Sequence, residues 1–229
     1  MRLVLIRHGQ TPSNVLGLLD TAPPGPGLTE LGITQAALVP DVVAGEPIQA
    51  IYASTATRAR QTAEPLADRL GLSVNIRGDI REIAAGDWEM LDDEHAVRGY
   101  LTLIGEWMAG RFDARSPGSA GESGHDVLQR FDRVVHEVAS SGVDGAALVA
   151  HGAINRLWAS VRAVNLPDDF GAEHALRNTG VVVLEGDLVE GWTVVSWSGA
   201  ELDREAAPDA ASAPDDDPFD ETIPVPGSP

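Results

Sequence analysis

The sequence of 229 residues contains no cysteine and no lysine, and each absence excludes a class of protein. Without cysteine there is no disulfide framework, no zinc–thiolate site and no thiol nucleophile. Sixteen arginines face 35 acidic residues, which gives a formal net charge of -19. Such an acidic chain disfavours general nucleic-acid binding, which requires clustered basic charge. An anionic substrate would have to be held by a local group of arginines, against the field of the whole molecule.

Long hydrophobic runs are also missing. No apolar run approaches the roughly 18 residues that a membrane-spanning helix needs. At the amino terminus the run Leu3–Ile6 lies between two arginines and is too short for the hydrophobic region of a secretory signal. We therefore expect a cytoplasmic protein without membrane contacts. Residues 201–229 are acidic and rich in proline, a composition typical of disorder, so one folded domain is expected over residues 1–200.

Short apolar runs alternate with segments of helical spacing through this domain. The expected strands are Leu3–Ile6, Ala50–Ala53, Val74–Ile76 and Ala147–Ala150, with Val181–Leu184 and Trp192–Trp197 as a closing antiparallel pair. Helices are expected over 30–43, 57–70, 92–110, 123–139 and 153–161. The alternation predicts an α/β fold, with a mostly parallel central sheet flanked by helices on both faces.

Two of the apolar runs end in a histidine followed by a glycine. Leu3–Ile6 leads directly into Arg7-His8-Gly9, and Ala147–Ala150 leads into His151-Gly152. Ligands of open α/β sheets bind beyond the carboxyl ends of the strands, so both histidines are expected at the site of chemistry. Core packing does not explain a polar pair at the end of each run.

Arginine beside histidine suits phosphoryl transfer. The transferred group spreads negative charge over three oxygens, and catalysis consists mainly of positioning and electrostatic stabilisation. The arginine fork donates two parallel hydrogen bonds to phosphate and keeps its charge. A neutral imidazole is a competent nucleophile near pH 7. Arg7 and His8, which follow one strand directly, are therefore suited to binding and transferring a phosphoryl group.

With Thr11 and Asn14, the Arg7-His8-Gly9 triplet resembles the signature of the histidine phosphatase superfamily, also called phosphoglycerate mutase-like. Further similar motifs follow in the family's order: Ser54–Thr62 with Arg58, Arg81-Glu82 with Gly86–Glu89, Gly121-Glu122-Ser123, and His151-Gly152. The resemblance covers about residues 1–200 and implies a phosphoglycerate mutase-like fold.

The resemblance also implies roles. His8 would attack phosphorus and become phosphohistidine, and His151 would donate to the phosphoryl oxygens. Glu82 would protonate the leaving oxygen and then accept a proton from the attacking water. The phosphate pocket would be completed by Arg7, Arg58, Thr11, Asn14 and Gly152. No metal or cofactor is implied. The expected partner is a small phosphorylated metabolite, and the chain is expected to be a monomer or a homodimer.

Two segments depart from the family's pattern and leave the substrate open. Met90 stands where the family often has glycine, and Leu18–Gly27 carries three prolines where the family has a shorter lead-in. Glu89 is interpreted as a structural carboxylate. The principal hypothesis is a metal-independent phosphatase of phosphomonoesters. Its alternatives are a cofactor-dependent phosphoglycerate mutase and a catalytically silent phosphate-binding module, although the motif residues expected of an active enzyme are all present.

Overall fold

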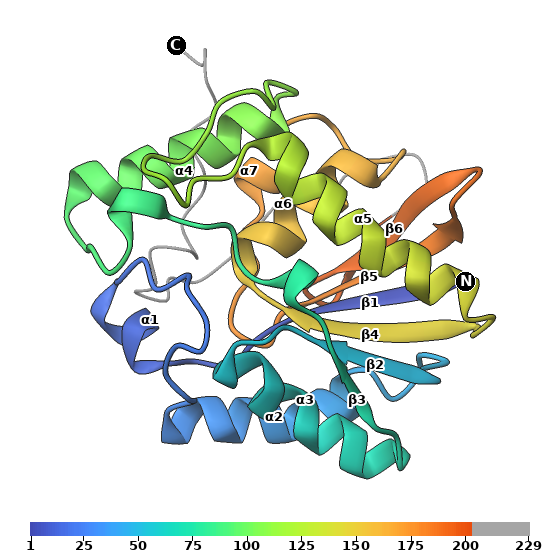
Figure 1. Ribbon diagram of the computed structural model, residues 1–229. Helices are drawn as coiled ribbons and strands as arrows, with labels where there is room; N and C mark the ends of the chain where they lie inside the picture. The colour runs from blue at the N-terminus through green and yellow to red at the C-terminus, as the bar shows by residue number, and fades with distance from the viewer. Residues whose placement is uncertain (203–229) are drawn as a thin grey trace.

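A computed structural model describes residues 1–202 and confirms the α/β architecture (Figure 1). Within this range one sheet has seven strands in the order β3-β2-β4-β1-β5-β6-β7. Their bounds are β1 Arg2–Arg7, β2 Ala50–Ala53, β3 Val74–Ile76, β4 Gly145–Ala150, β5 Val181–Asp187, β6 Gly191–Trp197 and β7 Ala200–Glu201. The strands β3, β2, β4 and β1 are parallel, as expected, and β5, β6 and β7 continue the sheet in antiparallel pairs.

Helices cover both faces of the sheet, as Figure 1 shows. The helices are α1 Pro12–Leu16, α2 Glu30–Val42, α3 Thr57–Leu70, α4 Glu94–Met108, α5 Gly124–Ser140, α6 Gly152–Arg162 and α7 Phe170–Glu173, with short 3-10 turns at Gly78–Ile80 and Gly86–Trp88. Burial on both faces of the sheet explains why the sequence of β1 is continuously apolar. Leu3 and Leu5 belong to the core under α4, α5 and α6, whereas Val4 and Ile6 belong to the core under α2 and α3.

The last described residues belong to the sheet and the core. Strand β7 pairs with β6, and Leu202 is buried, so residues 201 and 202 pack on the domain that was expected over residues 1–200. The rest of the predicted acidic tail, residues 203–229, lies outside the described residues.

The first long helix, α2, forms where predicted but buries a different face from its apolar stripe. Leu31, Leu38 and Val42 recur at helical spacing, yet each is more than half exposed. The helix instead packs through smaller residues, among them Gly32 and Ala36. Spacing therefore predicted the helix, whereas close packing chose the buried face.

Glycine at position 32 permits a close crossing beneath the first histidine loop. A Cβ added there would lie 2.1 Å from the carbonyl oxygen of Gln10, and one added at Gly9 would lie 2.7 Å from the carbonyl oxygen of Gly32. Both neighbours are backbone atoms, which cannot move without shifting the loop. The two glycines thus allow α2 to support the backbone that carries His8.

The Gly32→Ala variant is expected to lower the free energy of unfolding by about 1–3 kcal/mol, because it overpacks this crossing. The measurement is urea unfolding, and Gly45→Ala is the matched control, since a Cβ added at Gly45 meets nothing within 4 Å. If both variants were equally stable, the crossing would not require glycine.

Candidate active site

Parallel register brings the two histidine-bearing strands together. Strands β1 and β4 are neighbours, with Arg7 opposite Ala150, so His8 and His151 follow at the same edge of the sheet. Their ring centroids lie 5.2 Å apart in an edge-on arrangement. The strand-end prediction is therefore confirmed as a juxtaposition in space.

The hydrogen bonding of His8 determines which ring nitrogen is free to react. Its Nδ1 lies 2.8 Å from the carbonyl oxygen of Gly9, and a carbonyl only accepts, so Nδ1 carries the proton. The lone pair is therefore on Nε2. Burial, Arg58 and Arg7 together lower the pKa of His8 well below its ordinary value. The ring is neutral near pH 7, with one nitrogen available as a nucleophile.

His151 is buried beside His8 and is hydrogen-bonded to a residue to which the sequence analysis gave no role. Its Nε2 is hydrogen-bonded to Ser54 Oγ at 2.8 Å, and its Nδ1 has no hydrogen-bond partner among the described residues. Burial, Arg58 and His8 lower the pKa of His151 well below its ordinary value. When the serine hydroxyl donates to Nε2, the ring proton is on Nδ1, which then remains an available donor.

Two buried arginines supply positive charge at this edge. Arg7 donates from Nη1 to the Leu176 carbonyl oxygen at 2.7 Å. A Cβ added at Gly152 would lie 3.1 Å from Arg7 Nε, so the glycine leaves room for the guanidinium at the start of α6. Arg58, in the first turn of α3, donates from Nη2 to the Asp20 carbonyl oxygen at 2.8 Å. Both guanidinium groups are therefore held before any phosphate arrives.

Asp20 is a site residue that the sequence did not identify. Its Oδ1 lies 3.7 Å from Arg58 Nη1, and its Oδ2 accepts a hydrogen bond from Ser13 Oγ at 2.6 Å. The carboxylate thus orients Arg58 while lining the same pocket. Its position lies 38 residues from Arg58 along the chain, with no spacing pattern to connect them.

Thr11 and Asn14 lie in the pocket, but their side chains also build α1. Thr11 Oγ1 accepts from the Asn14 backbone N–H, and Asn14 Oδ1 accepts from the Thr11 backbone N–H, which forms a capping box. Asn178 also donates to Asn14 Oδ1 at 3.3 Å. The Asn14 amide nitrogen is therefore the better donor for phosphate, and the Thr11 hydroxyl acts mainly as a helix cap.

Glu82 reaches the site from the loop that follows β3 and rests on the start of α6. Its Oε1 accepts from the backbone N–H groups of Ile83 and Ile154 at 2.9 and 3.0 Å, and Oε2 accepts from that of Ala153 at 3.1 Å. Burial raises the pKa of this carboxyl, while these N–H groups and Arg58 oppose the rise. Because Oε2 accepts one such bond and Oε1 two, Oε2 is the oxygen better able to carry a proton.

The two segments that depart from the family pattern contact each other. Glu89 accepts hydrogen bonds from the backbone N–H groups of Thr21 and Ala22 and from the Thr21 hydroxyl. The backbone N–H of Met90 also donates to the Leu19 carbonyl oxygen at 3.0 Å. Glu89 therefore connects the two segments, in agreement with its interpretation as a structural carboxylate.

Together these side chains enclose one small polar pocket. Of the eight predicted site residues, seven line it, and the eighth, His151, lies beside His8 with its ring centroid 5.2 Å away. The pocket is lined by Arg7, His8, Thr11, Ser13, Asn14, Leu18, Asp20, Arg58, Glu82 and Gly152.

Within residues 1–202, no helix is both long and apolar enough to span a bilayer.

Comparison with known proteins agrees with this geometry. The model of the histidine phosphatase superfamily (branch 1) matches residues 3–199. A PE-PGRS family protein of Mycobacterium tuberculosis is 33% identical over 220 residues, which are 90% of this chain but only 38% of that longer protein.

Two further matches are phosphatases of a named substrate. Glucosyl-3-phosphoglycerate phosphatase of Mycolicibacterium vanbaalenii is 37% identical over 165 residues, covering 67% of this chain and 70% of that protein. The native structure of a mycobacterial glucosyl-3-phosphoglycerate phosphatase aligns with a TM-score of 0.70 and 27% identity, covering 86% of this chain and 98% of the other. The family and the fold predicted from the sequence are thus confirmed.

Proposed function

The chain belongs to the histidine phosphatase superfamily, and from this premise we propose that it hydrolyses phosphate monoesters of small metabolites through a phosphohistidine on His8. One observation carries the proposal. The Nδ1 bond of His8 to Gly9 leaves the Nε2 lone pair available in a pocket that also contains Arg7 and Arg58. The phosphatase relatives favour an enzyme over a silent binding module.

In the first step, the Nε2 lone pair of His8 attacks phosphorus, and the bond from phosphorus to the ester oxygen breaks. Arg7 and Arg58 hold the phosphoryl oxygens, where negative charge concentrates in the transition state. The proton on Glu82 Oε2 passes to the departing oxygen, so the alcohol leaves neutral. His151 donates from Nδ1 to a phosphoryl oxygen, and the Asn14 amide supplies a further donor.

In the second step, water attacks the phosphorus of phosphohistidine. Glu82, now a carboxylate, accepts a proton from this water at Oε2. The nitrogen–phosphorus bond breaks and its electron pair returns to His8 Nε2. Inorganic phosphate leaves, and both side chains return to their starting protonation states.

The choice between hydrolysis and mutase chemistry depends on what surrounds the pocket. A mutase must retain a doubly phosphorylated intermediate while it turns over, which requires cations beyond those that bind one phosphate. Here the side chains beside Arg58 include the carboxylates of Asp20 and Glu82, and the nearby segment 90–94 is acidic. Water is therefore the favoured acceptor of the phosphoryl group.

Incubation with 3-phosphoglycerate or glucosyl-3-phosphoglycerate tests this choice. Release of inorganic phosphate is expected, with little conversion of 3-phosphoglycerate to 2-phosphoglycerate whether or not 2,3-bisphosphoglycerate is present. The activity should persist in EDTA, because arginines supply the positive charge. Rapid isomerisation that depends on the bisphosphate, with little phosphate released, would instead show a mutase.

A further inference from the structure

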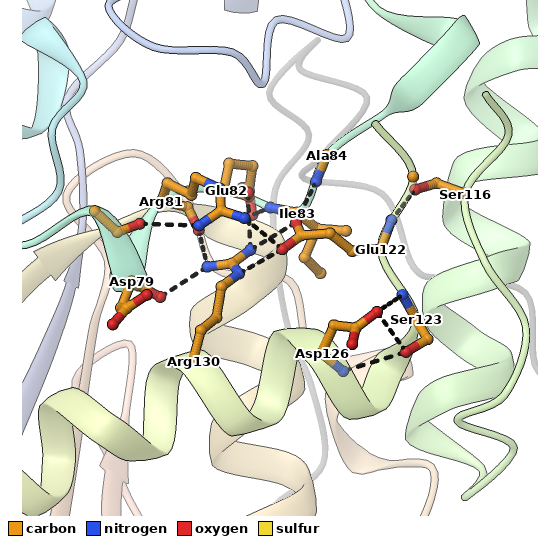
Figure 2. Close-up of polar contacts among 12 residues, drawn as sticks. Asp79, Arg81, Glu82, Ile83, Ala84, Ser116, Glu122, Ser123, Asp126 and Arg130 are labelled. Carbon is orange, nitrogen blue, oxygen red and sulfur yellow. Dashed lines mark hydrogen bonds and ion pairs between the residues drawn. The ribbon is translucent and has the colours of Figure 1, made fainter. Parts of the chain in front are cut away.

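A buried ion pair lies beside the segment 79–84, here called the acid loop because it carries Glu82, and none of the catalytic steps uses this pair. Arg130 projects from α5 and Glu122 from the loop before this helix, and both are at least 93% buried. Figure 2 shows the segment 79–84 beside the pair, and Glu82 in this segment also lines the pocket. A charged pair this far from solvent is costly to bury, and replacing it with apolar residues is often neutral for stability. Stability alone therefore does not account for it.

Arg130 uses all five of its N–H groups, and three of them hold the backbone of the acid loop. Nη1 donates to the carbonyl oxygens of Asp79 and Arg81 at 2.8 and 2.6 Å, and Nη2 donates to that of Glu82 at 3.0 Å. The remaining two N–H groups, on Nε and Nη2, donate to the Glu122 carboxylate at 2.8 and 3.1 Å. Only a planar fork offers five donors in these directions.

Glu122 holds the same loop from its other end. Besides Arg130, its carboxylate accepts from Arg81 Nη2 at 2.6 Å and from the Ala84 backbone N–H at 3.2 Å. The loop is thus fixed on both sides of Glu82. Its carbonyl groups accept hydrogen bonds from Arg130, and its Ala84 N–H group donates to Glu122. Beyond this pair, the Glu82 carboxylate rests on the N–H groups of α6.

We propose that Arg130 and Glu122 are positioning residues for Glu82, which hold its backbone at the distance from the phosphate pocket that proton transfer requires. The proposal rests on the assigned role of Glu82 as the general acid. Its physical basis is the steep dependence of catalysis on placement, since a shift of about 1 Å costs on the order of 100-fold in rate. With its backbone held at one end and its carboxylate at the other, the Glu82 side chain has little freedom to move.

The pair also holds the loop without adding net charge near the acid. An unpaired arginine at this point would favour ionised Glu82, which cannot donate a proton. Glu122 cancels that charge. The other titratable and charged groups around Glu82 are Arg7, His8, Asp20 and Arg58 in the pocket, Arg81 on the same loop, and Glu89, Tyr100 and His151.

Replacing Arg130 with lysine separates geometry from charge. Lysine keeps the positive charge but concentrates its three donors on one nitrogen, so it cannot hold three carbonyl groups and a carboxylate together. Relative to wild type, Arg130→Lys should lower kcat/KM for n-butyl phosphate at least about ten-fold more than kcat/KM for 4-nitrophenyl phosphate, whose leaving group needs no acid. The ratio of the two constants does not depend on how much of the preparation is folded.

Arg133→Lys is the matched control. Arg133 lies on the same helix and pairs with the Asp79 side chain, but its own side chain is 55% exposed and contacts none of the acid-loop carbonyls described above. It should leave the substrate ratio unchanged. Equal losses on both substrates in Arg130→Lys, or the same altered ratio in Arg133→Lys, would overturn the positioning role.

Glu122→Gln provides the second, independent variant. It keeps the shape of the side chain but leaves the Arg130 charge uncompensated, so the pKa of Glu82 falls. The alkaline limb of kcat/KM for n-butyl phosphate should therefore move to lower pH by about one unit, because Glu82 must be protonated to act. An unmoved limb, or one moved to higher pH, would contradict the proposal. Glu82→Gln, measured in parallel, distinguishes failure of the positioning role from failure of the proposed function. If Glu82→Gln shows no dependence on the leaving group, the assignment of Glu82 as the general acid is wrong.

Discussion

His8→Ala is expected to abolish turnover, with a loss of roughly 10⁴-fold or more, because removing a covalent nucleophile leaves only binding and electrostatic stabilisation. The structural reason is specific. His8 Nε2 has the free lone pair of a ring whose Nδ1 proton is bound by the carbonyl oxygen of Gly9. Phosphate release from 4-nitrophenyl phosphate measures the loss.

Trapping identifies the intermediate directly. Wild-type protein quenched with denaturant during turnover should carry phosphate on His8 that is labile to acid and stable to base. His136→Ala, which changes an exposed histidine on α5, is the control and should keep full activity. Phosphate trapped on a serine, or substantial activity in His8→Ala, would refute the phosphohistidine mechanism.

The lowered pKa of His8 should also determine at how low a pH the enzyme keeps its kcat/KM. The nucleophile must be neutral, and burial with Arg58 and Arg7 keeps it neutral to lower pH than a free imidazole. Activity should therefore persist at pH values where an ordinary histidine is protonated. The measurement is kcat/KM as a function of pH. No loss of kcat/KM is expected as the pH falls through the ordinary pKa of a histidine side chain.

Glu82→Gln is expected to have the second largest effect, and that effect should depend on the leaving group. General acid catalysis contributes on the order of 10²–10⁴-fold when the departing oxygen is a poor leaving group. The variant should therefore lose about 100-fold or more in kcat/KM with n-butyl phosphate and far less with 4-nitrophenyl phosphate. Glutamine preserves the size of the side chain but carries no transferable proton.

The pH profile of this variant supplies a second readout. In wild type the rate with n-butyl phosphate should fall as pH rises through the Glu82 pKa, which burial raises above its ordinary value. In Glu82→Gln that alkaline limb should vanish, while the ionisation of the substrate remains common to both proteins. Asp87→Asn is the control, since Asp87 is an exposed carboxylate that lies against Gly118 outside the pocket. Equal losses on both substrates would assign the acid to another group.

The sequence was sufficient for the parts of this protein whose signal is local. An apolar run ending in Arg7-His8-Gly9 shows where a buried strand stops and a polar loop begins, because burial on both faces requires continuous apolar residues. A second run ending in His151 has the same meaning. Val127, Phe131 and Val134 recur at helical spacing on α5, and all three are buried as that spacing indicates.

Tertiary structure decided the pairings between residues far apart in the chain. Ser54 holds His151 across 97 positions, and Arg130 holds the carbonyl group of Glu82 across 48. Asp20 orients Arg58 in the same way. No periodicity relates such residues, because each contact depends on which elements pack together and at what distance.

The helix α2 shows the same division within one element. Helical spacing depends on backbone geometry alone, and it was visible in Leu31, Leu38 and Val42. Which face is buried depends on what the neighbouring surface can accept, and here α2 approaches a backbone loop closely enough to admit only glycine at position 32. The buried face therefore begins with the small residues Gly32 and Ala36, and Leu31 and Leu38 remain on the outer face.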